Sequence, residues 1–147
     1  MEKYMKEAIK EAKKSLLTDD VPIGAIIVEN DKIIARGHNQ KEKSKLSTMH
    51  AEIIAINKAC KKKKDWRLDD CTLYVTNEPC LMCCGAIIQS RIKKVVYGCK
   101  NPKFGYVESI ETILTNKKNN HIVEIKQGIL EEECTKMLQT FFKKKRH

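Results

Sequence analysis

The sequence of 147 residues contains no uninterrupted run of about twenty apolar residues, the length that a membrane-spanning helix requires. Its first residues, Met1-Glu2-Lys3-Tyr4, lack the apolar core of a secretory signal. We therefore expect a cytoplasmic protein without a membrane association. Because the chain also shows no repeat, low-complexity linker or shift in composition, we expect one domain spanning residues 1–147.

Cysteine spacing typical of a disulfide framework is also absent, and the seven cysteines are an odd number. This pattern is typical of a reducing compartment, where some cysteines bind metal and the others act as small apolar residues. Acidic residues are few, 19 against 29 Lys and Arg, which leaves a net charge of +10. Such a charge permits a nucleic-acid partner, although the dominance of lysine could equally reflect a coding bias.

Aromatic residues make up only 5% of the chain, yet two of them, Phe141-Phe142, directly precede the basic run Lys143-Lys144-Lys145-Arg146. A second basic run is Lys61-Lys62-Lys63-Lys64. Each run by itself is more typical of a solvated surface than of a binding patch. The terminal run is the better candidate for binding nucleic acid, because unstacked bases can lie on the neighbouring rings.

Hydrophobic periodicity predicts an α/β fold in which helices and strands alternate. Asn30-Asp31 is expected to join the first two strands as a hairpin, and the strand–helix–strand segment over residues 72–98 to form a right-handed parallel crossover. Residues 39–48 are expected to form a loop, and residues 61–70 a charged connection. Predicted helices cover residues 3–17, 79–90 and 129–144, with a buried helix starting near 50 and a short one over 108–114; predicted strands cover residues 23–28, 32–37, 72–76, 94–98 and 122–125.

Two short motifs contain the residues suited to catalysis. The first is His50-Ala51-Glu52, and the second is Pro79-Cys80 followed by Cys83. A catalytic zinc ion needs about three protein ligands and one open position, which His50, Cys80 and Cys83 can supply. The carboxylate of Glu52 is then free to move protons beside the metal. Alone, the two cysteines would suit a structural zinc knuckle or a redox pair, but both motifs in this order are unlikely by chance.

Cys84 is an alternative ligand and could close the site as a structural one. If Pro79 occupies the first position of a helix, Cys80 and Cys83 lie on one face, and Cys84 is rotated by about 100°. We therefore predict that Cys83 binds the metal and that Cys84 packs as a small apolar residue. The N-termini of two helices would then converge on the metal and favour an anion there.

The two motifs together are the signature of the zinc nucleobase deaminases. Over nearly its whole length the sequence resembles the bacterial tRNA-specific adenosine deaminases, which convert the wobble adenosine of an anticodon to inosine. This resemblance implies a three-layer α/β/α fold like that of the cytidine deaminases, with a mixed central sheet. Besides the two motifs, it rests on residues 21–25, 38–39, 85–86, 90–92 and 128–130, on Gly98, Lys103 and Gly105, and on Glu133-Cys134 and Phe141-Phe142.

The resemblance also implies the roles of individual residues. Each subunit of a homodimer would bind one Zn²⁺ ion through His50, Cys80 and Cys83, with Glu52 as the proton shuttle. A tRNA anticodon stem-loop would be the partner. Its contacts would be Asn39 on the purine, Val21 and Ala51 against the base, Asn101 and Lys103 along the ribose-phosphate chain, and Phe142, Lys145 and Arg146 around the flanking nucleotides. From its residue type alone, Asn39 would be at least as likely to hydrogen-bond its own loop.

Some positions depart from the family pattern, and two other functions stay open. Asn77, Asn101 and Tyr106-Val107-Glu108 differ from the usual residues. The change to Asn101 suggests weaker discrimination between ribose and deoxyribose, unless Asn101 serves only a turn. One alternative is a metabolic deaminase of a free base or nucleoside, such as guanine deaminase; the other is a non-catalytic, zinc-containing RNA-binding subunit. The sequence does not identify the tRNA.

Overall fold

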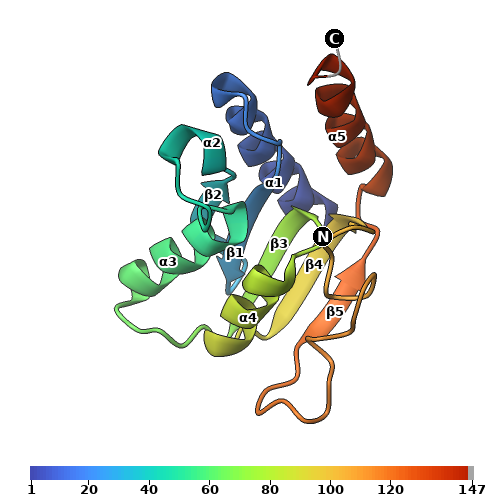
Figure 1. The fold of residues 1–147 in the computed structure, drawn as a ribbon. Helices are drawn as coiled ribbons and strands as arrows, with labels where there is room; N and C mark the ends of the chain where they lie inside the picture. Colours follow the sequence, from blue (N-terminus) through green and yellow to red (C-terminus); the bar gives the residue numbers. More distant parts are fainter. Residues whose placement is uncertain (146–147) are drawn as a thin grey trace.

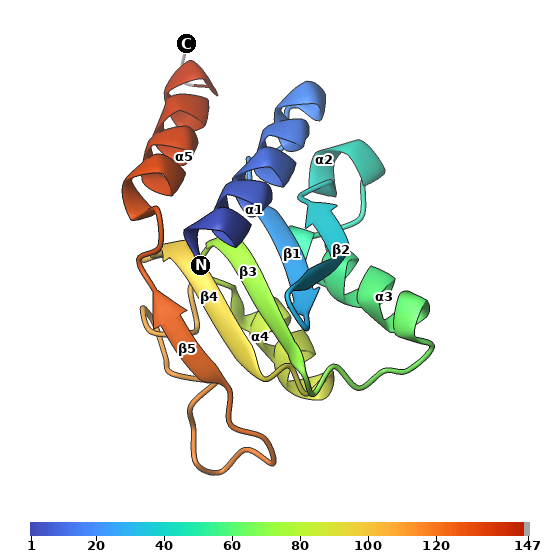
Figure 2. The same ribbon diagram turned by 180° about the vertical axis from the view of Figure 1, so that it is seen from behind.

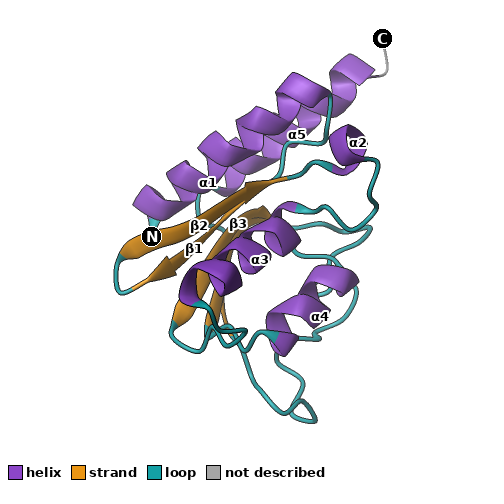
Figure 3. Ribbon diagram, turned by 90° about the vertical axis from the view of Figure 1, so that its left-hand side faces the viewer, coloured by secondary structure: helices purple, strands orange, loops and turns teal. Residues whose placement is uncertain are grey.

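The computed structural model describes residues 1–145 as three layers, with a five-stranded sheet between two pairs of helices (Figures 1 and 3). This architecture confirms the predicted α/β/α class. None of the helices in the described residues is both long and apolar enough to cross a membrane. In chain order the elements are α1 Glu2–Lys14, the 3-10 turn η1 Ser15–Thr18, β1 Gly24–Glu29, β2 Lys32–His38, α2 Lys41–Ser44, α3 Ala51–Lys63, β3 Cys71–Asn77, α4 Leu81–Gln89, β4 Lys94–Cys99, β5 Glu124–Gln127 and α5 Glu131–Lys145.

The sheet is mixed, with the strand order β2-β1-β3-β4-β5. β1 pairs antiparallel with β2 and β3, whereas β4 pairs parallel with β3 and β5. Asn30 and Asp31 both have positive φ angles, 50° and 61°, as the central residues of a tight hairpin turn of the I′ type do. The predicted hairpin and the predicted parallel crossover through α4 are therefore confirmed.

Alternating side chains of the central strands build two separate cores. Leu73 and Val75 on β3 lie in the core beneath α3 and α4, while Tyr74 between them lies in the core beneath α1 and α5. β4 repeats this alternation, with Val95 and Val96 on opposite faces. Figure 2 shows α1 and α5 side by side over one face, and Figure 3 shows α3 and α4 over the other. The period of two thus buries both faces of the sheet.

Glycine lets two helices approach the sheet closely. A Cβ atom on Gly24 would lie 2.0 Å from the carbonyl oxygen of Ala8 in α1. A Cβ atom on Gly37 would lie 2.6 Å from the carbonyl oxygen of Ala51, in the first turn of α3. Since real Cβ atoms cannot come so near, glycine at these two positions sets how closely each helix packs.

Two predicted loop segments contain helix. Residues 39–48, predicted as loop, contain the single turn α2, because the buried carboxylate of Asp20 accepts hydrogen bonds from the backbone N–H groups of Glu42 and Lys43. The predicted connection from Lys61 to Asp70 starts later than expected, since α3 continues to Lys63. Because lysine is a good helix former, the helix continues into the run of lysines, and the run does not mark the end of the helix.

Two predictions in the C-terminal third are wrong. Residues 108–114 form turns and irregular backbone, not a short helix. The last strand covers Glu124–Gln127, two residues later than predicted, and Ile122 is exposed. Parallel pairing of Glu124 with Lys94 sets this register, which the apolar residues Ile122 and Val123 do not reveal.

Gly24→Ala is expected to destabilise the protein by about 1–3 kcal/mol, the usual cost of overpacking, because the new methyl group collides with α1. The matched control is Gly85→Ala in α4, where nothing lies within 4 Å of the added Cβ atom. Alanine in place of a helical glycine should stabilise by roughly 0.5–1 kcal/mol. Urea unfolding measures both changes, and equal stability of the two variants would contradict the close contact between β1 and α1.

Candidate active site

Two helices begin at potential metal ligands. His50 is the N-cap of α3, with φ −79° and ψ 155°, and Cys80 is the N-cap of α4, with φ −76° and ψ 175°. Neither side chain caps its own helix, so both remain free to bind something else. Pro79 precedes the N-cap of α4 and does not open the helix, which corrects the sequence prediction.

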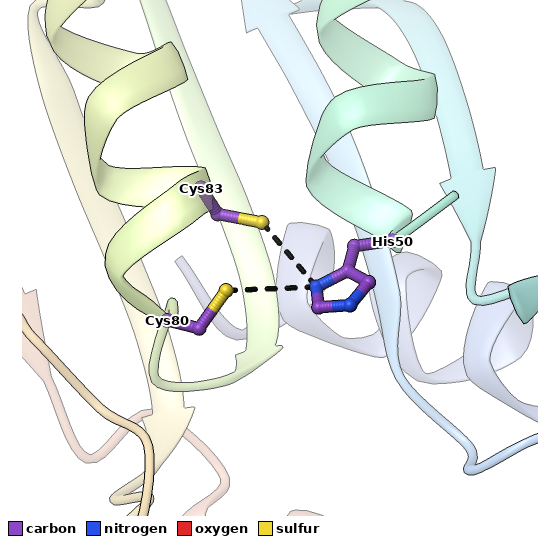
Figure 4. A group of neighbouring side chains, drawn as sticks. All are labelled: His50, Cys80 and Cys83. Atoms are coloured by element: carbon purple, nitrogen blue, oxygen red, sulfur yellow. Dashed lines mark hydrogen bonds between the residues drawn. The ribbon is translucent and has the colours of Figure 1, made fainter. Parts of the chain in front are cut away.

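The side chains of His50, Cys80 and Cys83 point toward one another (Figure 4). The Nδ1 atom of His50 lies 3.6 Å from the Sγ atom of Cys80 and 3.6 Å from that of Cys83. The three ligand atoms all lie within 4.8 Å of one another. A tetrahedral zinc ion with ordinary bond lengths separates its nitrogen and sulfur ligands by about 3.6 Å. The two nitrogen-to-sulfur distances therefore fit zinc, with three protein ligands among the described residues.

Cys84 does not belong to this group. It is fully buried, and its thiol lies 3.7 Å from the carbonyl oxygen of Pro79, to which it donates a hydrogen bond. Cys83 and Cys84 thus point to different sides of α4, as expected for neighbours in a helix. The backbone of α4 selects Cys83 for the cluster.

The pKa values of the two cysteines in the cluster are shifted in opposite directions. A hydrogen bond from the Cys83 thiol lowers the pKa of Cys80 to about 4; burial opposes this effect, and a hydrogen bond with His50 adds to it. The pKa of Cys83 is raised, because it donates that hydrogen bond and is buried. The surroundings of Cys80 thus favour its thiolate form, and the charge of a bound cation would favour the thiolate of Cys83 as well.

Glu52 lies in the first turn of α3 and is only 4% exposed. Burial raises the pKa of its carboxyl to about 7, and the nearby Cys80 adds to the rise, while a backbone hydrogen bond, His50 and Cys83 oppose it. A carboxyl group with this pKa can both accept and donate a proton near neutral pH. His50, Cys80 and Cys83 all influence this pKa, so the carboxyl of Glu52 lies near the cluster.

Both the backbone and the side chain of Asn39 form hydrogen bonds. Its backbone N–H donates to Ile23 and its carbonyl oxygen accepts from the hydroxyl of Ser15, at 2.9 and 2.7 Å. Its side-chain amide donates to the carbonyl oxygen of Val21 at 3.2 Å and accepts from the N–H of Lys41 at 3.1 Å. The loop role that residue type suggested is therefore present. One amide N–H and one lone pair remain for a ligand.

The sequence analysis assigned no role to Glu78, which organises the loop over residues 101–109. Its buried carboxylate accepts five hydrogen bonds from that loop. The donors are the backbone N–H groups of Asn101, Val107, Glu108 and Ser109 and the hydroxyl of Ser109. Burial raises the pKa of Glu78, but these hydrogen bonds outweigh burial and lower the pKa below its ordinary value. An acidic residue directly after a buried strand was the available signal for this role.

The loop is joined through its backbone to the segment that carries Cys80. Gly105 pairs with Cys80 in an isolated β-bridge, and the N–H of Tyr106 donates to the carbonyl oxygen of Pro79 at 3.0 Å. Lys103 on this loop is exposed. The side-chain oxygen of Asn101 accepts a hydrogen bond from the N–H of Phe104 at 3.3 Å, which is the turn role considered for it. Predicted substrate residues therefore lie on a loop attached to a predicted metal ligand.

Ala51, Phe142 and Lys145 lie in the first or last turn of a helix. Ala51 is the first residue of α3 and is fully buried. Near the end of α5, Phe142 is 45% exposed, whereas Phe141 is buried and lines a groove of about 680 Å³ between α1 and α5. Lys145 forms an ion pair with Asp19, two residues before Val21. Arg146 lies outside the described residues.

Comparison with known proteins connects this geometry to named families. The family model of the MafB19-like deaminases matches residues 1–146. A tRNA-specific adenosine deaminase of Streptococcus pyogenes serotype M1 is 50% identical over 143 residues, covering 97% of this chain and 84% of the relative. That of Bacillus subtilis (strain 168) is 50% identical over 145 residues, covering 99% and 90%.

Solved structures show the same fold. One comes from a study of A-to-I editing by tRNA:A34 deaminases at the wobble position of transfer RNA; it is 38% identical, with a TM-score of 0.89, over 92% of this chain and 99% of the other. A guanine deaminase of Bacillus subtilis is 42% identical, with a TM-score of 0.64, over 67% of this chain and 64% of the other. The sequence and the fold agree, and the chain therefore belongs to the MafB19-like deaminases and to the family of the tRNA-specific adenosine deaminases.

Proposed function

We propose that this protein is a zinc-dependent hydrolytic deaminase that converts adenosine to inosine at the wobble position of a tRNA anticodon. The observation that supports this most directly is the His50, Cys80 and Cys83 triangle with the buried carboxyl of Glu52 beside it. The near-complete matches to tRNA-specific adenosine deaminases support the choice of substrate. The overall reaction consumes adenosine and water and releases inosine and ammonia.

His50, Cys80 and Cys83 would hold one zinc ion per subunit. When bound, zinc supplies Lewis acidity that makes water a nucleophile at neutral pH. Glu52 then accepts a proton from the attacking water and donates one to the N1 atom of the adenine ring. Glu52 then takes the remaining proton from the new hydroxyl group on C6 and passes it to the amino group, which departs as ammonia and leaves the C6 carbonyl of inosine. The pKa of about 7 suits both directions of transfer.

Substrate recognition is assigned to the residues around this cluster. The free N–H and lone pair of the Asn39 amide can hydrogen-bond a purine edge, because each purine edge combines donors and acceptors. Val21 and Ala51 would contact the base, and Asn101 and Lys103 the ribose-phosphate chain. Phe142, Lys145 and Arg146 would contact the flanking nucleotides. The net charge of +10 favours a polyanionic partner.

Three further assignments accompany this function. Residues 1–147 would form one deaminase domain, because both cores share one sheet. Two copies would associate as a homodimer, as the family resemblance implies. The reaction would take place in the cytoplasm, where a bacterial tRNA is located.

Deamination of free guanine is the second candidate, favoured by the 42% identity to a guanine deaminase. The exposed ring of Phe142 beside basic residues opposes it, because a small free base does not require such a surface. A non-catalytic RNA-binding subunit is the third. Glu52 argues against a non-catalytic subunit. Burying its carboxyl group beside the cluster costs desolvation free energy, and a protein without catalytic activity would gain nothing in return.

Incubation of the zinc-loaded protein with an anticodon stem-loop carrying adenosine at the wobble position should release ammonia and leave inosine. The matched controls are the same stem-loop with its adenosine outside the wobble position, and free guanine, cytosine and adenosine. Turnover of free guanine at a higher kcat/KM than the stem-loop would replace the proposed function with the metabolic one.

Cys83→Ala is expected to lose zinc, whereas Cys84→Ala should retain one zinc per chain, because only the Cys83 thiol lies in the cluster. Metal content measured by mass spectrometry after dialysis decides between them. A metal-free Cys84→Ala protein would overturn the assignment of ligands.

Glu52→Gln is expected to keep zinc but to deaminate the stem-loop roughly 10²–10⁴-fold more slowly, the usual contribution of general acid–base catalysis. The substitution preserves side-chain size and removes the titrating group. Single-turnover kinetics and metal content are measured on the same sample. Loss of zinc in this variant would show that Glu52 is a ligand and not the proton shuttle.

A further inference from the structure

Phe104 is a large apolar side chain left in water. Its side chain is 65% exposed, more than that of Trp66 or Phe142, at 55% and 45%. Exposing an aromatic ring forgoes the stabilisation that burial would bring. Single exposed apolar residues are common on protein surfaces, so the anchoring and the position of Phe104 decide whether it can contact a partner.

The loop that carries Phe104 is anchored by the buried side chain of Glu78. Its neighbour Gly105 packs against Glu78 so closely that a Cβ atom would lie 2.4 Å from the carboxylate carbon. The five hydrogen bonds to Glu78 attach both ends of the loop, and the N–H of Phe104 itself donates to Asn101. An exposed ring on an anchored backbone loses little conformational freedom on binding, which favours its use as a binding surface.

The position of Phe104 ties it to the proposed reaction centre. Gly105, the next residue, forms the β-bridge with Cys80, so Phe104 lies one residue from the partner of a proposed metal ligand. Lys103 on its other side is exposed, as is Lys100. An exposed ring flanked by lysines is the combination that binds single-stranded nucleic acid, with bases on the ring and phosphates at the ammonium groups.

We propose that Phe104 is a stacking platform for the base of a nucleotide adjacent to the target adenosine. This inference rests on the proposed function and adds a residue that reads the RNA beside the reacting base. Stacking fits better than hydrogen bonding, because the ring has no donor or acceptor. Adjacency to the target follows from the bridge between Gly105 and Cys80.

Trp66 provides the matched control. It is an exposed aromatic residue in a basic segment, but it follows the C-terminus of α3, whereas the metal cluster lies at the N-terminus of that helix. The guanidinium of Arg67 also lies over its ring, 5.0 Å from the centroid. Trp66→Ala therefore removes an exposed ring without affecting the proposed RNA contact.

The test measures binding separately from turnover. Affinities are obtained by fluorescence anisotropy with zinc-loaded protein carrying Glu52→Gln, so that the stem-loop is not converted. In this background Phe104→Ala is expected to bind the wobble-adenosine stem-loop roughly 5- to 150-fold more weakly, the range for loss of one base–aromatic stack. Phe104→Trp should keep the affinity, and Trp66→Ala should change it less than about twofold.

A scan with abasic nucleotides shows whether the lost contact is a stack. Removing the one base that stacks on Phe104 should weaken binding to the parent protein but cause no further loss in Phe104→Ala. Unchanged affinity in Phe104→Ala, or an equal loss against every abasic stem-loop, would overturn the proposal. So would dissociation of an oligomer by Phe104→Ala in sedimentation, because the ring would then contact a second copy of the chain.

Failure of this proposal differs from failure of the proposed function. A native protein that binds the stem-loop through Phe104 but leaves the wobble adenosine unchanged would refute the reaction and keep the platform. If Phe104→Ala deaminates the stem-loop with an unchanged KM, the proposed reaction is kept and the stacking platform is refuted. Since Phe104 is exposed, its variants should unfold at the same urea concentration as the parent chain.

Discussion

The convergence of the first turns of α3 and α4 on one point is the constraint on which the site depends. The right-handed crossover from β3 to β4 places the start of α4 at the carboxyl end of β3, and the close contact of Gly37 with α3 sets the other helix beside it. Because His50 and Cys80 are N-caps, their extended backbones aim both side chains away from the helices. The positive ends of two helix dipoles therefore meet where the Cys80 thiolate lies.

Two buried carboxyl groups near this point behave in opposite ways. Glu52 has few partners, so burial dominates and raises its pKa into the neutral range. Glu78 is equally inaccessible, but hydrogen bonds from the 101–109 loop stabilise its charge and lower its pKa. The environment thus makes Glu52 suitable for moving protons, whereas the hydrogen bonds that lower the pKa of Glu78 hold the backbone of the loop. Glu78 thus keeps the irregular 101–109 loop in a definite position beside Cys80.

Exposed rings and lysines occur on two elements that are proposed to contact RNA. Phe104 and Phe142 lie on different elements, one on the loop anchored by Glu78 and the other on α5. Lys145 reaches Asp19 in the segment that leads to Val21, and Val21 accepts a hydrogen bond from Asn39. The end of α5 is therefore connected, through short polar contacts, to the residues proposed to hold the base.

By itself the sequence determined the α/β class and nearly all helices and strands, because these depend on periodicity within single elements. The two motifs also named His50, Cys80 and Cys83, but their meeting depends on two helices that converge in the fold. Tertiary structure decided the rest. α2 exists because Asp20, about twenty residues earlier, caps it, and β5 takes its register from β4. The 101–109 loop is irregular because the backbone N–H groups of Asn101, Val107, Glu108 and Ser109 donate to the carboxylate of Glu78 and not to carbonyl oxygens of a helix or strand. Partners this distant in the chain leave no local pattern to read, so only the folded chain reveals them.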